Sequence, residues 1–103
     1  MGKNKDRESL IRVIVNVVVH EIVLRNTNRP ESKNFVRSEI IEYSKKAKGD
    51  ILKHNWNEKD REYIRENGLD GVKNRMKEKY YDIDFDESEI EEILNREMSE
   101  LFD

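Results

Sequence analysis

The sequence contains no cysteine, no glutamine, one proline and four glycines in 103 residues. Without cysteine, disulfides and thiolate metal sites are excluded. The glycines (Gly2, Gly49, Gly68 and Gly71) are too dispersed to form a phosphate-binding loop. Charged residues make up 42% of the chain, a level that raises the question of disorder. Because proline and glycine are scarce and eight aromatic residues are present, we expect a folded chain.

Apolar residues are also in short supply, at 35% of the composition. At this length the chain is expected to form one domain, residues 1–103, with a thin core. Such a core is completed within the chain or by self-association. The Lys- and Glu-rich, Gln-free composition is compatible with a heat-loving source, and an AT-rich genome would produce the same bias.

No hydrophobic run is long enough to span a membrane. The longest, residues 10–24, is interrupted by Arg12, Asn16, His20 and Glu21. It is therefore too short and too polar for a transmembrane helix or a signal peptide. Asp6 stands where an N-myristoylation motif has Ser or Thr. We expect a soluble cytoplasmic protein with no membrane partner.

Charge is strongly segregated along the chain. Residues 82–103 hold ten acidic residues and one basic residue, whereas the remaining 81 residues hold 19 basic and 13 acidic ones. A net charge of +6 therefore faces −9 in a chain whose total is −3. The two parts are expected to attract each other or to attract different partners.

Residues 7–25 are rich in Val and Ile, like a strand. Their polar residues Glu8, Arg12, Asn16 and His20 nevertheless recur at every fourth position. Strict alternation fails, and a helix with one narrow polar stripe fits. Its other faces are apolar, so we expect a helix that is central or packs against a second copy. A strand is the alternative, because β-branched residues are poor helix formers.

A second helix is expected after a polar connector, residues 26–34, that contains Pro30. It covers residues 36–48 and ends at Gly49, which suits a left-handed C-cap. Its apolar face is expected to comprise Ile40, Ile41 and Tyr43.

Three more helices complete the expected set of about five. Asn57 is typical of an N-cap for a third helix, which ends at Asn67–Gly68, and a fourth covers residues 70–81. The third helix directs Tyr63 and Ile64 inward. Residues 81–85 alternate and predict one short strand or a rudimentary wing.

The last helix is expected to begin with a capping box of Asp86 and Glu89. Its apolar face comprises Ile90, Ile93, Leu94, Met98, Leu101 and Phe102. The fold class is therefore mainly α, with a flexible N-terminus over residues 1–6, a helical core over 7–85 and an acidic amphipathic helix over 86–103.

No combination of side chains points to catalysis or metal binding. Residues 82–86 begin like a calcium loop, but Glu87 and Ile93 stand where that loop needs glycine and a bidentate glutamate. His20 and His54 have no partner at metal-ligand spacing and are expected to be structural or solvent-facing. The clustered carboxylates of the last helix are expected on its solvated outer face: Glu91, Glu92 and Glu97. We expect no catalytic residue, no cofactor, no metal and no enzymatic activity.

Basic residues are concentrated in two segments. The first lies in the second helix and comprises Arg37, Lys45, Lys46 and Lys48. The second lies in the fourth helix, interleaved with apolar residues, and comprises Lys73, Asn74, Arg75 and Lys77. Arg and Asn can hydrogen-bond to base edges and Lys can neutralise phosphates, although a solvated helix face has the same composition.

A long apolar helix, a polar connector and the run from Phe35 to Ile41 together resemble the opening of winged-helix DNA-binding domains. In that superfamily an aromatic–x–x–small–acid–aliphatic run commonly starts the second helix. Residues 71–77 are similar to a recognition helix, and the resemblance covers about residues 7–85. Residues 50–69 separate the two elements, where the superfamily usually has a short turn.

The resemblance implies a role for both basic segments. The segment at residues 37–48 would contact phosphates, and the segment at residues 73–77 would face the major groove of double-stranded DNA. The first and last helices would form a homodimer, with an interface of Ile11, Val15, Val18, Ile22, Ile90, Leu94 and Leu101.

Two functions are therefore expected from the sequence. The first is a small dimeric DNA-binding protein, a transcriptional regulator. The alternative is a non-enzymatic helical protein–protein interaction module that uses the apolar first helix and the acidic C-terminal helix. A variant of the alternative has the acidic helix compete with nucleic acid for a basic partner. The oligomeric state and the identity of the partner stay open.

Overall fold

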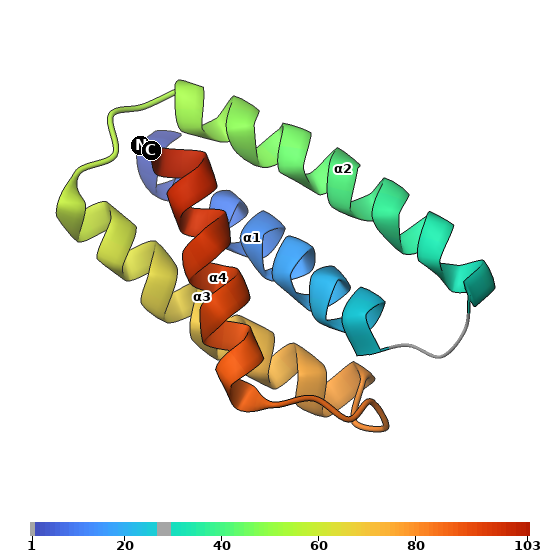
Figure 1. Ribbon diagram of the computed structural model, residues 1–103. Helices are drawn as coiled ribbons and strands as arrows, with labels where there is room; N and C mark the ends of the chain where they lie inside the picture. The colour runs from blue at the N-terminus through green and yellow to red at the C-terminus, as the bar shows by residue number, and fades with distance from the viewer. Residues whose placement is uncertain (1, 27–29) are drawn as a thin grey trace.

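The computed structural model describes residues 2–26 and 30–103, and the side chains of these residues except 30–32. It contains four helices: α1 (Gly2–Asn26), α2 (Pro30–Leu52), α3 (Glu58–Lys79) and α4 (Glu87–Phe102) (Figure 1). No strand occurs in the described ranges. The mainly α class is therefore confirmed, and the expected count of about five helices is wrong.

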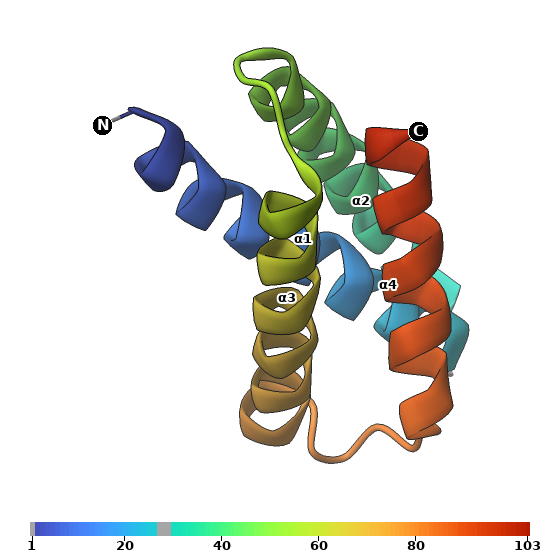
Figure 2. The ribbon, with the colours of Figure 1, turned by 90° about the vertical axis from the view of Figure 1, so that its left-hand side faces the viewer.

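Helix α1 is the centre of the molecule. It packs against α2, α3 and α4, and Figures 1 and 2 show it passing between α2 and α3 with α4 lying across it. Nine of its residues are buried, whereas Glu8, Arg12, Asn16 and His20 are exposed or half-exposed. The predicted polar stripe is confirmed, and the alternative of a strand is wrong. Residues 2–6, expected to be flexible, form the first turns of α1.

The hydrophobic core gathers around α1. Ile64, Val72 and Met76 join it from α3, and the predicted apolar face of α4 packs against the same core. Ile90, Ile93 and Leu94 of that face are fully buried. Tertiary burial of this kind explains why a Val-rich segment of low helix propensity is helical.

Helix α3 continues through Asn67–Gly68, where the sequence predicted a break, and so joins the predicted third and fourth helices. None of the glycines in the described residues has a positive φ. Gly68 is buried beside Leu94, and a Cβ on Gly71 would lie 2.7 Å from Cγ2 of Val15. Glycine is therefore present where neighbouring helices approach α3 closely, and it does not end the helix.

The bounds of α2 also differ from prediction. The helix begins at Pro30, whose fixed φ suits a first helical turn, and continues past Gly49 to Leu52. Residues 27–29 of the predicted connector lie outside the described residues. Ile41, expected inward, is 55% exposed. The buried side of α2 instead contains Val36, Ala47 and Asp50.

Two predicted helix starts are confirmed. Asn57 caps α3 in a capping box with Asp60, whose backbone N–H donates to the Asn57 side chain at 2.8 Å. Asp86 caps α4 by accepting from the backbone N–H of Ser88 at 3.1 Å. The Glu89 carboxylate, expected to complete a capping box, accepts a hydrogen bond from Asn26 of α1. Residues 80–86 form a turn and connector where the strand was predicted, so that prediction is wrong.

Candidate interaction surface

Helix α2 has one covered side and one open side. It packs against α1 and, to a lesser extent, α4, and among the described residues it makes no contact with α3. Its buried residues follow one another at helical spacing: Val36, Ala47 and Asp50, with Tyr43 half-buried between them. The opposite side of the helix therefore faces away from the core (Figure 1).

The open side of α2 is both apolar and basic. Phe35, Ile41 and Leu52 are 67%, 55% and 87% exposed, and they are three of the five large exposed hydrophobics of the described chain. Every basic residue that the sequence analysis singled out on this helix is exposed as well. We call this surface the α2 outer face: Phe35, Arg37, Ile41, Lys45, Lys46, Lys48 and Leu52. Glu42 is its exposed acidic neighbour.

Four residues of the α2 outer face form a narrow row. Ile41, Lys45, Lys48 and Leu52 are spaced by four, three and four residues. At 3.6 residues per turn they fall within about 60° of one another, along about 16 Å of helix. We call this row the α2 seam. It places two cations between two exposed aliphatic side chains.

The basic segment of α3 is less open. Asn74 and Lys77 are exposed, whereas Lys73 and Arg75 are partly covered. Val72 and Met76, with which they alternate, are buried in the core. The exposed surroundings also include the carboxylates of Asp70 and Glu78. This part of α3 is therefore a mixed-charge surface.

The two basic segments do not meet. They lie on α2 and α3, and α1 lies between these helices (Figure 2). A helix-turn-helix unit needs its two helices packed against each other, and the described residues contain no such α2–α3 contact and no strand that could form a wing. The winged-helix resemblance stays a prediction without support from this arrangement.

The residues expected to form a dimer interface lie within the core of a single chain. Ile11 and Val15 are 7% and 6% exposed, and Val18, Ile22, Ile90 and Leu94 are at most 1% exposed. Leu101 is partly buried and packs against the same core. A dimer formed through these side chains would require the bundle to open.

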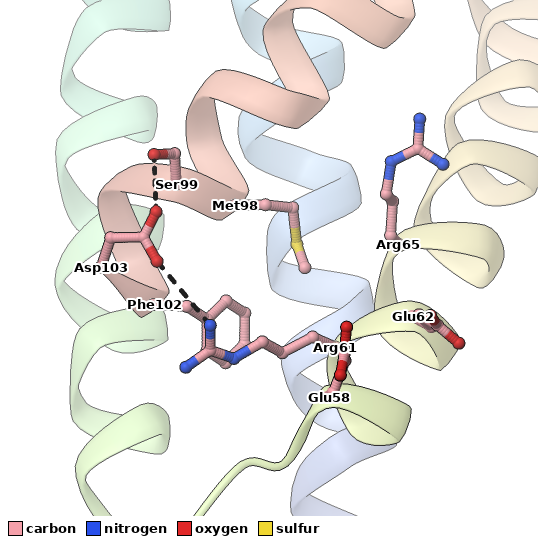
Figure 3. A pocket seen from close by; sticks show the side chains of 8 residues that line it. All are labelled: Glu58, Arg61, Glu62, Arg65, Met98, Ser99, Phe102 and Asp103. Carbon is pink, nitrogen blue, oxygen red and sulfur yellow. Dashed lines mark hydrogen bonds and ion pairs between the residues drawn. The ribbon is translucent and has the colours of Figure 1, made fainter.

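A shallow groove of about 280 Å³ lies between the start of α3 and the end of α4. Its lining includes Met98 and Phe102, and the guanidinium of Arg61 lies over the Phe102 ring (Figure 3). Arg61 also pairs with Asp103 at 3.7 Å, and Nε of Arg65 donates to Asn95 at 2.7 Å. The cations of this groove are thus held by neighbouring side chains of the chain itself.

Both histidines make contacts within the chain. Nδ1 of His20 lies 2.6 Å from the Asn16 carbonyl oxygen, one turn earlier in α1. Nε2 of His54 lies 2.6 Å from Oδ2 of Asp6, and this hydrogen bond holds the pKa of the Asp6 carboxyl below its ordinary value. His54 also stands edge-on to Trp56. The hydrogen bond between His54 and Asp6 links the start of α1 to the α2–α3 connector.

One carboxylate of α4 departs from expectation. Glu97, expected on the outer face, is 5% exposed. Burial raises the pKa of its carboxyl to about 7. The sequence signal was present, because Glu97 follows Ile90, Ile93 and Leu94 at helical spacing and so shares their face.

The described residues contain no group of three or more His, Asp or Glu side chains that could hold a metal ion. No helix among them combines the length and the apolar character needed to cross a membrane. No protein-family model matches the sequence, and no curated protein and no solved structure matches the chain. Over residues 2–26 and 30–103 the fold is all-α, with four helices, and α2 carries a basic, apolar outer face.

Proposed function

We propose that this chain is a non-enzymatic, cytoplasmic protein-interaction module that binds its partner through the α2 outer face. One observation carries the proposal: three exposed hydrophobic side chains share one helix surface with four exposed cations. Exposed apolar residues grouped on a polar surface are typical of interaction sites.

The apolar and the basic residues of the α2 outer face contribute differently to binding. Apolar anchors supply most of the affinity of a helix-in-groove contact. Cations at the rim select the charge of the partner and speed its approach. The proposal differs from the sequence expectation, because the apolar first helix is enclosed by the other three helices and the binding helix is α2.

DNA binding is the second candidate, favoured by Asn74 and Lys77, which are exposed on α3. Under this proposal α3 contacts bases in the major groove of the DNA, and the cations of α2 lie on the other side of α1. Replacing Lys73 and Arg75 by Ala then removes retardation of a DNA duplex while the thermal midpoint moves by about one or two degrees. Unchanged retardation by the double variant would end this candidate.

Photo-crosslinking distinguishes the two functions. A photoreactive p-benzoylphenylalanine is placed at Ile41 in one protein and at Asn74 in another, and each is irradiated in its source cells. The interaction module gives discrete protein adducts from position 41 that disappear when Lys45 and Lys48 are also changed to Glu. Nucleic-acid adducts from position 74, with none to protein from position 41, would contradict it.

A further inference from the structure

We infer that the partner of the α2 outer face is an acidic amphipathic helix, held along the α2 seam. This inference rests on the proposed function and adds the chemistry of the partner. The partner helix presents two carboxylates three residues apart, with an aliphatic residue four positions before the first and four positions after the second. That pattern is the complement of the α2 seam.

The exposed ends of the α2 seam favour an apolar occupant. Ile41 and Leu52 are 55% and 87% exposed, and their separation corresponds to three helical turns. A partner helix with aliphatic residues at the same interval covers both at once. The 4-3-4 spacing is the same in either direction, so the seam accepts a parallel or an antiparallel helix.

The centre of the α2 seam favours an occupant with negative charge. Lys45 and Lys48 are both exposed, and Arg37 and Lys46 add positive charge on the same helix. Carboxylates opposite Lys45 and Lys48 would form ion pairs between the two aliphatic contacts, partly shielded from water by them. Charge complementarity thus sets the identity of the partner and the aliphatic ends set the register.

A second copy of this chain does not fit the same surface. Two α2 helices packed antiparallel along the seam would place Lys45 of one copy against Lys48 of the other. A parallel arrangement would place each lysine against its own counterpart. Either arrangement brings like charges together, which is unfavourable.

Other anionic surfaces fit less well than a helix. A duplex offers a continuous phosphate charge but nothing apolar to cover Leu52. A membrane-surface helix needs a broad apolar face, whereas two lysines interrupt the α2 seam. A short acidic helix carries fewer charges than a duplex or a membrane surface. It also offers both aliphatic side chains for Ile41 and Leu52 and carboxylates for Lys45 and Lys48.

The test uses the full chain and a fluorescent synthetic helix of about 20 residues that contains Leu-x-x-x-Glu-x-x-Glu-x-x-x-Leu. A second peptide has Lys at both Glu positions. We expect the acidic peptide to bind at least about tenfold more tightly than the Lys peptide, with affinity that falls as salt rises. Changing Lys45 and Lys48 to Glu should reverse the preference, so that the Lys peptide binds the variant.

A matched control carries the same charge change elsewhere. Lys5→Glu with Lys59→Glu, both at exposed positions, should leave the affinity for the acidic peptide within about twofold of the native chain. An acidic peptide that binds no better than its scrambled version overturns the inference. So does equal loss of binding in the control.

Three further binding measurements distinguish the acidic helix from the alternative occupants of the α2 seam. Tighter binding of a DNA duplex than of the acidic peptide, tighter binding of phosphatidylserine vesicles, or self-association abolished by the Lys45 and Lys48 changes each overturns the acidic-helix partner. Protein adducts from position 41 without peptide binding would refute this inference and leave the proposed function intact. Absence of the adducts together with peptide binding would refute the proposed function, while the preference of the α2 seam for an acidic helix would stand.

Discussion

At the scale of single residues, Gly71 shows how closely α3 lies against α1. A Cβ at this position would come within 2.7 Å of Cγ2 of Val15, whereas a Cβ on Gly49 would meet nothing within 4 Å. Both glycines lie inside helices, where alanine has the better intrinsic propensity. The two positions therefore separate helix propensity from packing.

We predict opposite effects of the same substitution at these two sites. Gly49→Ala should raise the free energy of unfolding by about 0.5–1 kcal/mol. Gly71→Ala gains the same propensity, but overpacking against the stiff Val15 side chain costs about 1–3 kcal/mol, so the net effect is a loss. Urea denaturation of both variants measures the difference. Equal stabilisation by the two changes would contradict the close approach of α1 and α3.

Glu97 is a second residue with a specific physical consequence. It is buried in α4, which packs against α1, α2 and α3. Burial is the main cause of its raised pKa, and the charges of Glu100 and Glu21 act in the same direction. The opposing cations are Arg96 on α4 and Lys48 on α2.

The raised pKa predicts a pH dependence of stability. The folded chain holds the Glu97 proton up to about pH 7, whereas the unfolded chain releases it near 4.5. The favourable contribution is therefore present below pH 4.5 and is lost as pH rises to about 7. Relative to the native chain, Glu97→Gln should gain about 1–3 kcal/mol of unfolding free energy between pH 5 and pH 8. Parallel profiles for the two proteins would show that the carboxyl titrates normally.

At the scale of elements, α4 joins an acidic outer surface to an apolar inner one. Its ion pairs to the rest of the chain include Arg25 with Glu92 at 3.7 Å and Arg96 with Glu21. Such exposed pairs contribute little to stability. The buried Ile90, Ile93 and Leu94 contribute more, at about 1.5–3 kcal/mol each.

Truncation after Tyr81 should therefore abolish cooperative unfolding. The loss of three buried aliphatic residues is comparable with the total stability of a small domain. Circular dichroism during thermal unfolding checks this outcome. Glu91→Gln, which changes an exposed residue of α4, is the control and should unfold like the native chain. A truncated chain with a sharp transition would show that α4 is an accessory to the fold.

The sequence predicted helices best where the spacing of polar and apolar residues indicates which face is buried. The polar residues at every fourth position of α1 and the caps at Asn57 and Asp86 are local signals, and the structure confirms them. Helix ends at Gly49 and Gly68 were predicted wrongly, because glycine adopts helical φ as readily as left-handed φ. The prediction of a strand at residues 81–85 was wrong for a different reason. Alternating apolar and polar residues form a strand only where a partner strand is available.

At the scale of the whole molecule, the arrangement of helices decides which residues can act together. The sequence identified the exposed cations of α2, but their separation from those of α3 depends on α1 passing between the two helices. The role of Ile41 also depends on packing. Val36, Tyr43 and Ala47 share a face at helical spacing, and this signal could have shown that Ile41 points away from the core.

Binding is expected to be confined to one side of the molecule, the α2 outer face. The most direct measurement follows the backbone amide resonances of the isotope-labelled chain as the acidic peptide is added. We predict that the largest shifts occur at Ile41, Lys45, Lys48 and Leu52, with little change along α3. Shifts concentrated at Lys73–Lys77, or spread evenly over all four helices, would show that the peptide does not bind at the α2 outer face.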